Sequence, residues 1–312
     1  MAPFPFNSHT PHPSKGSKKR EFLSDSHNHR HRNKIAFRDR VLSIIVWFVA
    51  LSVAASFALI LGHLVWHGSS HLSWEFLTTD PENAGREGGI ASILVSTALI
   101  LGVCLGVSLP LGLGTAILLS EFTASNNLFS RLLRRSLDML AGVPSIVFGL
   151  FGNSFFCVTL GLGFSILSGG LTLACMVLPI LIRSIEEGLR AVPNEYRFGA
   201  ASLGISRTST LIHLLLPAAV PSLIAGLILG IGRVIAETAA LIYTSGYVDR
   251  QPTSLFDSGR ALSLHIYELS MNVPGGDDNA YASAVILVIF ILSINTIAIF
   301  LGKQWHNRSI QQ

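Results

Sequence analysis

The sequence predicts an all-α integral membrane protein with six transmembrane helices and both termini in the cytoplasm. Half of its 312 residues are hydrophobic and only 13% are charged, whereas soluble domains contain about 25% charged residues. A helix needs about 20 apolar residues to cross the hydrocarbon core of a bilayer. Six segments meet this requirement, at residues 41–66, 90–119, 139–163, 166–186, 217–243 and 281–302.

The distribution of basic residues predicts the orientation of these spans. Of the 22 Lys and Arg residues, 18 lie in the N-terminal segment, the second and fourth connections and the C-terminus, and three lie in the other connections. Cytoplasmic connections carry an excess of Lys and Arg. We therefore expect both termini and the fourth connection, residues 187–216, in the cytoplasm. The outer connections, 67–89 and 247–280, are long enough to meet a partner outside the membrane.

The two terminal segments and the cysteines indicate neither a folded domain nor a metal site. Residues 1–40 are basic and rich in Pro, Ser and His, so they bury too little apolar surface to fold and predict a disordered cytoplasmic tail near anionic lipid. Its alternating His27, His29 and His31 suit a solvated tail better than a metal site, because ordering the chain costs entropy. Residues 303–312 are a short cytoplasmic C-terminus. The three cysteines lack metal-ligand spacing, and we predict no metal and no cofactor.

The fourth connection, "EGLRAVPNEYRFGAASLGISRTSTLIHLLLP", is the most informative segment. Pro193 is suited to open a helix, and Gly204 is suited to end it. Between them, Gly199 and Ala200 give the helix a smooth surface of small residues. Such a helix on the cytoplasmic side is suited to docking in a groove of another protein, although an ordinary amphipathic connector has the same pattern.

Part of this connection, "FGAASLGISRTSTLIHLLLP", resembles the EAA loop of ABC importer permeases. That loop reads Glu-Ala-Ala, three residues, Gly, nine residues, then an apolar residue, any residue and Leu-Pro. Phe198 stands where the loop has glutamate, which leaves a polar anchor at this position in doubt. The resemblance assigns coupling to an ATPase to five residues: Gly199, Ala200, Gly204, Leu216 and Pro217.

The resemblance extends over residues 72–302 and is closest to phosphate importer permeases of the PstA type. It is carried by "LAGVPSIVFGLFG", "LTLACMVLPILIRSIEEGLRAVPNEYRFGAASLG" and "GRVIAETAALIYTSG". The resemblance implies the type I ABC importer fold, in a multi-pass protein of the bacterial cytoplasmic (inner) membrane with a permease core at residues 90–302. The implied partners are a PstC-type second permease, a PstB-type ATPase dimer, a PstS-type phosphate-binding protein, phosphate and membrane lipid, with no nucleic acid.

Other functions compete with phosphate import. The chain has no G-x-x-x-x-G-K-[ST] phosphate loop, so we expect partner subunits to hydrolyse ATP and the chain itself not to be an enzyme. A permease for molybdate or sulfate is the main alternative. A secondary transporter or channel is less favoured, because the long fourth connection has no counterpart in the first half to suggest an inverted repeat. A membrane enzyme would need clustered His, Asp or Glu within the spans.

Two charged residues, Arg233 and Glu237, interrupt the apolar span 217–243. Residues four apart share one face of a helix, and an ionised side chain at the centre of a bilayer costs about 2.5–3.5 kcal/mol on insertion scales. We therefore expect the pair to face the interior of the bundle. It is either a structural salt bridge or part of an anion path, in which the Arg233 fork binds phosphate oxygens and Glu237 holds the fork in position.

Overall fold

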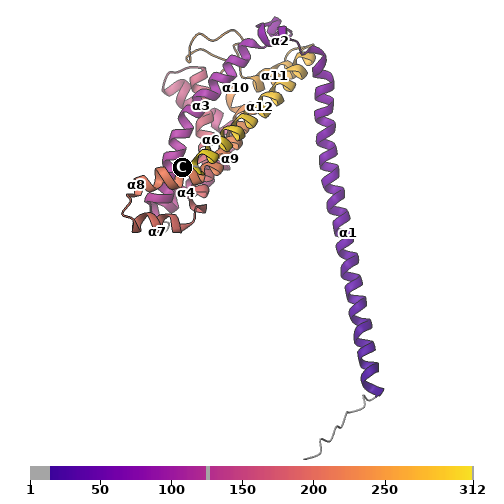
Figure 1. Ribbon diagram of the computed structural model, residues 1–312. Coiled ribbons are helices and arrows are strands. Elements are labelled where there is room, and N and C mark those ends of the chain that lie inside the picture. Colours follow the sequence, from indigo (N-terminus) through magenta and orange to yellow (C-terminus); the bar gives the residue numbers. More distant parts are fainter. Residues whose placement is uncertain (1–14, 124–126, 311–312) are drawn as a thin grey trace, which may run out of the picture. The chain divides into compact units, whose positions relative to one another are not determined.

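A computed structural model describes residues 15–123 and 127–310 (Figure 1). The chain divides into two compact units, residues 1–63 and 64–312. Most of the long helix α1 (Lys15–Gly68) belongs to the first unit. The second unit contains every other helix and strand of the described chain and all of the candidate site residues.

Helix α1 contains the predicted first span and begins well before it. The membrane-compatible part is Asp39–His71, in agreement with the prediction of a span over 41–66. The backbone is already helical from Lys15, so residues 15–40 differ from the predicted disorder. Once a helix has been nucleated, each added residue contributes one hydrogen bond, and an apolar span can extend into the preceding polar residues in this way. Residues 1–14 of the predicted tail lie outside the described residues.

Four long helices form the bundle of the second unit: α3 (Ala91–Ile117), α6 (Ile166–Ala191), α9 (Leu216–Ile235) and α12 (Asp277–Ile310). Helix α6 is central, and Leu173, Val177 and Leu181 on it are completely buried. Helices α9 and α6 approach each other closely at one crossing, and this approach depends on a glycine. A Cβ atom on Gly226 would lie 2.5 Å from the Cβ atom of Ser184, so only glycine fits at this crossing.

Shorter elements connect and extend these four helices. The π-helical turn η3 (Leu118–Phe122) continues α3, and a second one, η5 (Leu211–Leu215), leads into α9. The remaining elements are η1 (Ser69–His71), α2 (Trp74–Thr78), β1 (Pro81–Glu82), η2 (Asn83–Gly85), β2 (Glu87–Gly88), α4 (Leu128–Ala141), α5 (Ser145–Gly152), η4 (Asn153–Thr159), α7 (Asn194–Ser202), α8 (Arg207–Thr210), α10 (Ala239–Ile242) and α11 (Leu262–Met271). Strands β1 and β2 pair antiparallel, with Pro81 opposite Gly88.

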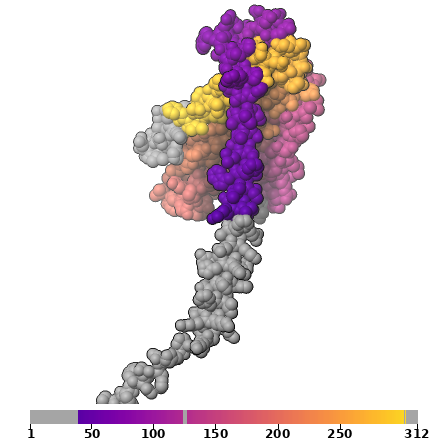
Figure 2. All heavy atoms as spheres, turned by 90° about the vertical axis from the view of Figure 1, so that its right-hand side faces the viewer, coloured from indigo at the N-terminus to yellow at the C-terminus, as the bar shows by residue number. Residues whose placement is uncertain are grey.

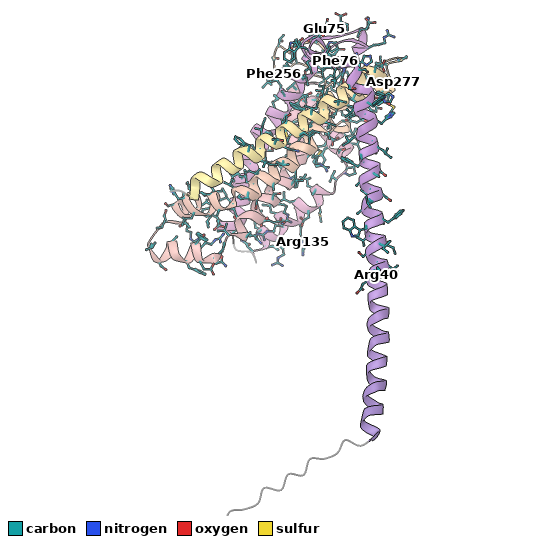
Figure 3. All side chains as sticks on the ribbon, turned by 45° about the vertical axis from the view of Figure 1, so that its right-hand side comes forward. Arg40, Glu75, Phe76, Arg135, Phe256 and Asp277 are labelled. Carbon is teal, nitrogen blue, oxygen red and sulfur yellow. The ribbon has the colours of Figure 1, made fainter. Side chains whose placement is uncertain are left out.

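The second unit has two distinct ends. Helices α2 and α11 lie at one end, and α7 and α8 lie at the other (Figure 1). We call these the α11 end and the α7 end. Figure 3 places Glu75, Phe256 and Asp277 at the α11 end and Arg135 at the α7 end. The basic fourth connection is thus at the α7 end, and both predicted outer connections are at the α11 end.

The predicted third span is bent in the structure. Five helical segments of the described chain are long and apolar enough to cross a membrane, and a sixth is counted if the bent pair α4 and α5–η4 forms one span. The two parts of that pair meet at 102°. Val143 and Pro144 separate them, because proline has no N–H and disfavours helical backbone in the residue before it. The span predicted over 139–163 therefore begins later than expected, at Ser145, and continues as α5 and η4 to Thr159.

Candidate transport site and coupling segment

Arg233 lies in the last turn of α9, on a stripe of exposed residues. Pro221, Ala225 and Leu229 precede it at intervals of four and are exposed as well, so the four residues share one side of the helix. On the opposite side, Val234 and Ile235 are buried and line a small cavity with residues of α3. The Arg233 side chain therefore points away from the chain's own bundle, whereas the sequence analysis expected it to point inward.

Glu237 does not share a helix face with Arg233, which corrects the predicted arrangement. Helix α9 ends at Ile235 and α10 starts at Ala239, so the span predicted over 217–243 is broken between them. A carboxylate oxygen of Glu237 accepts a hydrogen bond of 3.2 Å from the backbone N–H of Ala240. Among the described residues, no ion pair joins Arg233 to Glu237. Glu237 caps α10 instead, because unpaired N–H groups at a helix start favour a carboxylate.

The backbone around Glu237 is fastened to the α11 end. The Ser263 hydroxyl of α11 donates a hydrogen bond of 2.6 Å to the carbonyl oxygen of Glu237. The backbone N–H of Leu262 donates to the Thr97 hydroxyl of α3 at 2.9 Å. The first bond connects the interruption between α9 and α10 to α11, and the second connects α11 to α3. Arg233 therefore lies just before a break in the helix that tertiary hydrogen bonds hold in place.

The helix predicted between Pro193 and Gly204 is present as α7 (Asn194–Ser202), directly after Pro193. Its end has the hydrogen bonds of a Schellman motif. Gly204 has φ +72° and donates to the Ala201 carbonyl at 3.0 Å, and Ile205 donates to the Ala200 carbonyl at 3.0 Å. Only glycine adopts this backbone without strain. The predicted helix and its glycine stop are confirmed.

The residues assigned to coupling lie on different sides of α7 and α9. Gly199 and Gly204 are exposed, and a Cβ atom on either would meet no neighbour. Ala200 is buried, with 4% of its surface exposed. Leu216 and Pro217 form the half-buried start of α9. The free surface of α7 thus consists of Gly199 and larger neighbours such as Phe198, which is 70% exposed.

The α7 end also contains an ion-pair network that sequence reasoning missed. Glu186 is buried, and its carboxylate lies 2.7 Å from Arg134, 3.0 Å from Arg190 and 3.5 Å from Arg183. Separately, Arg197 of α7 pairs with Glu121 of η3 at 2.6 Å. Only the spacings of Arg183, Glu186 and Arg190, three and four apart on one helix, were visible in the sequence.

The two outer connections contact each other at the α11 end, where they lie side by side (Figure 2). The Gln251 amide donates to the Asp80 carboxylate at 3.0 Å, and the Asn279 amide donates to the Gly85 carbonyl at 3.0 Å. Beneath them, His265 is completely buried. Burial lowers the pKa of its imidazole to about 3, with a further contribution from the nearby Arg260 guanidinium.

The fold is that of ABC importer membrane subunits. A solved bacterial ABC transporter for the import of alginate matches with a TM-score of 0.59 at 13% identity, over 86% of this chain and 98% of the solved chain. The inward-facing MetNI methionine ABC transporter matches with a TM-score of 0.54 at 16% identity, over 70% of this chain and 94% of the solved chain. At these identities the likeness concerns the fold alone, and it confirms the predicted ABC importer permease fold.

The chain belongs to the family of binding-protein-dependent transport system inner membrane components, whose profile matches residues 108–310. It is therefore a multi-pass component of the cytoplasmic membrane. It is 31% identical to the probable ABC transporter permease protein YqgI of Bacillus subtilis, over 86% of this chain and 97% of that protein. It is 36% identical to the phosphate transport system permease protein PstA 1 of Mycobacterium tuberculosis, over 68% of this chain and 69% of that protein. The predicted resemblance to PstA-type permeases is confirmed.

Proposed function

We propose that this chain is the PstA-type permease subunit of an ATP-driven importer of inorganic phosphate. Relatives named as phosphate permeases support the substrate. The observation that carries the proposal is Arg233, an exposed guanidinium near the end of a candidate span. Its planar guanidinium fork matches two phosphate oxygens in geometry.

The exposure of Arg233 requires a second subunit. A charge in contact with lipid is costly, and the chain's own bundle does not cover the stripe that ends at Arg233. The small residues on that stripe, such as Ala225, allow another helix to approach closely. A second permease facing this stripe would enclose a path between the two subunits, and Arg233 would line it.

The α7 end provides the contact with the ATPase. Helix α7 is short; Phe198 on its free side is 70% exposed, and Leu203, directly after the helix, is 79% exposed. Exposed apolar side chains of this size on a polar segment are typical of interaction surfaces. The excess of arginine at this end supports a cytoplasmic position. A pair of ATPase subunits bound here would supply the energy for transport.

The α11 end provides the contact with the phosphate-binding protein. The two outer connections bind each other there and form one continuous surface. Trp74 and Tyr267 are exposed on it, and aromatic side chains are enriched at protein interfaces. Cross-links from probes at these two positions to the binding protein, in a complex that transports phosphate, would support this contact.

Uptake of labelled phosphate by the complex in vesicles tests the proposal. We expect Arg233→Gln to reduce ATP-dependent uptake by at least about 100-fold, the loss expected when a bidentate charged contact is removed. Arg233→Lys keeps the charge without the fork and should be impaired as well. Arg135→Gln is the matched control, because Arg135 is also exposed but lies in α4 at the α7 end.

Two outcomes would contradict the proposal. Uptake by the Arg233→Gln complex at the unmodified rate would exclude Arg233 from the path. Inhibition by sulfate or molybdate at the concentrations at which unlabelled phosphate inhibits would show that the transported ion is a different oxyanion. Assembly of the complex is checked in each case by co-purification of the second permease and the ATPase.

A further inference from the structure

One guanidinium, that of Arg197, connects three elements at the α7 end. Arg197 belongs to α7, and its Nη2 and Nε atoms donate to the two carboxylate oxygens of Glu121 in η3, at 2.6 and 3.2 Å. Its Nη1 and Nη2 atoms also donate to the carbonyl oxygens of Val192 and Leu189, both at 2.9 Å. A bidentate contact with a carboxylate is among the strongest side-chain hydrogen bonds.

Two of the residues that Arg197 contacts, Leu189 and Glu121, lie at the ends of candidate membrane spans. Leu189 lies in the last turn of α6, where carbonyl groups have no partner within the helix. Glu121 lies in η3, the π-helical turn at the end of the span that starts at Ala91. The Arg197 side chain is 24% exposed and that of Glu121 is 14% exposed, so water screens this pair less than a surface pair.

The ion pair connects α7 directly to η3. A cavity lies beside it, lined by Phe122 of η3, Ala201 of α7 and Leu215 of η5, among others. Close apolar packing therefore does not fill the space between α7 and the end of α3. Because Arg197 fixes the rotation of α7, the next residue, Phe198, is directed away from the bundle.

We propose that the Arg197–Glu121 pair transmits the movement of α7 to the span α3–η3, so that both move as one body when the ATPase binds nucleotide. The proposal rests on the proposed function, in which α7 contacts the ATPase. Arg197 is a positioning residue that acts through Glu121. Its fork also holds the end of α6, so the pair joins α7 to two of the four bundle helices.

The first test measures how many phosphate ions are imported per ATP hydrolysed. Glu121→Gln keeps the shape of the side chain and removes its charge, and Arg197→Lys keeps the charge and loses the fork. We expect each variant to lower this ratio at least about tenfold, the effect of one charge-assisted hydrogen bond, while ATP hydrolysis continues. Asp138→Asn is the matched control, because Asp138 pairs with Arg183 at the same end without touching α7. A Glu121→Gln ratio equal to that of Asp138→Asn would overturn the proposal.

The second test does not depend on the transported ion. Spin labels are attached at Leu203, beyond the end of α7, and at Leu118 in η3, both exposed, in a chain whose three cysteines are replaced by alanine. In the assembled complex, a non-hydrolysable ATP analogue should leave the distance between the labels unchanged. In the Glu121→Gln complex the same analogue should change it. An unchanged distance in Glu121→Gln would overturn the proposal even if phosphate is not the substrate.

Discussion

The two ends of the second unit are held together by different interactions. At the α7 end, ion pairs join the elements: Glu186 with three arginines, and Arg197 with Glu121. At the α11 end, Arg260 also pairs with Asp249 at 3.6 Å, but most of the side chains there bind backbone groups, and glycines allow close contact. The Asn279 amide donates to the Gly85 carbonyl, and Gly85 itself lies against His265.

Because of this difference, the α7 end tolerates small shifts of its helices, and the α11 end does not. Apart from the bidentate bond of Arg197 to Glu121, which fixes α7 on η3, the ion pairs of the α7 end can keep their attraction while the helices that carry them shift by a few ångström, because Coulomb energy varies slowly with distance. A glycine contact has no such tolerance, since repulsion rises within tenths of an ångström. We therefore expect conformational change at the α7 end and a fixed geometry at the α11 end. Four predictions test this comparison, from the largest effect to the smallest.

Removing the central carboxylate of the α7 end should have the largest effect. Glu186→Gln leaves Arg134, Arg183 and Arg190 without their shared counter-charge around a buried position. Breaking a buried pair in this way costs about 3–5 kcal/mol. The measurement is thermal unfolding of the purified complex in lipid nanodiscs. An unchanged midpoint would show that the α7 end does not depend on these charges.

Adding a side chain at a glycine contact should destabilise the α11 end, by somewhat less than Glu186→Gln destabilises the α7 end. Gly85 has φ +91°, and a Cβ atom there would lie 2.6 Å from Cε1 of His265. Strain and overpacking of this kind cost about 1–3 kcal/mol each. We expect Gly85→Ala to speed hydrogen exchange in α11. Gly102→Ala is the control, since a Cβ atom on Gly102 meets no neighbour; equal exchange in the two variants would contradict the rigid α11 end.

Acid should weaken the α11 end through His265. The pKa of His265 is about 3 in the folded chain, against an ordinary value of 6.5, so the unfolded state binds the proton first. The contribution of His265 is complete above pH 6.5 and is lost as the pH falls from there toward 3. Between pH 7 and pH 5 the loss is about 2 kcal/mol.

The comparison of the unmodified chain with His265→Asn isolates this effect from other titrating groups. Hydrogen exchange in α11 should rise from pH 7 to pH 5, after correction for the intrinsic rate, in the unmodified chain only. The same pH dependence in both chains would assign the effect to another group.

The exposed ion pair of the α7 end should give the smallest effect. Asp138 pairs with Arg183, and its side chain is 62% exposed. Surface pairs are worth about 0–1 kcal/mol, so Asp138→Asn should shift the thermal midpoint only slightly. A shift as large as that of Glu186→Gln would show that burial does not distinguish the two carboxylates.

The sequence predicted the features that depend on local chemistry. The spans over 90–119 and 166–186 correspond to α3 with η3 and to α6, because continuous apolar segments define them. Helix α7 was predicted together with its glycine end. The excess of arginine was also visible, although its pairing with particular carboxylates was not.

The sequence did not predict the features that depend on tertiary contacts. Hydropathy is continuous through Pro144 and through Glu237, so it indicated one uninterrupted span at each place. The break before α10 is held by the Ser263 hydroxyl, which is 26 residues away in the sequence. The ion pair of Arg197 with Glu121 joins residues 76 positions apart. No spacing rule connects such residues.

The exposed position of Arg233 has a consequence for synthesis and turnover. Under the proposed function, a copy of this chain without the second permease leaves the stripe from Pro221 to Arg233 uncovered in the bilayer. Its inserted state is then less stable, by up to the few kcal/mol that a charge in lipid costs. Membrane proteases that degrade incompletely assembled subunits would encounter this copy more often in an extracted or partly unfolded form. Balanced production of the two permeases therefore protects the chain, and surplus copies should have short half-lives in the cell.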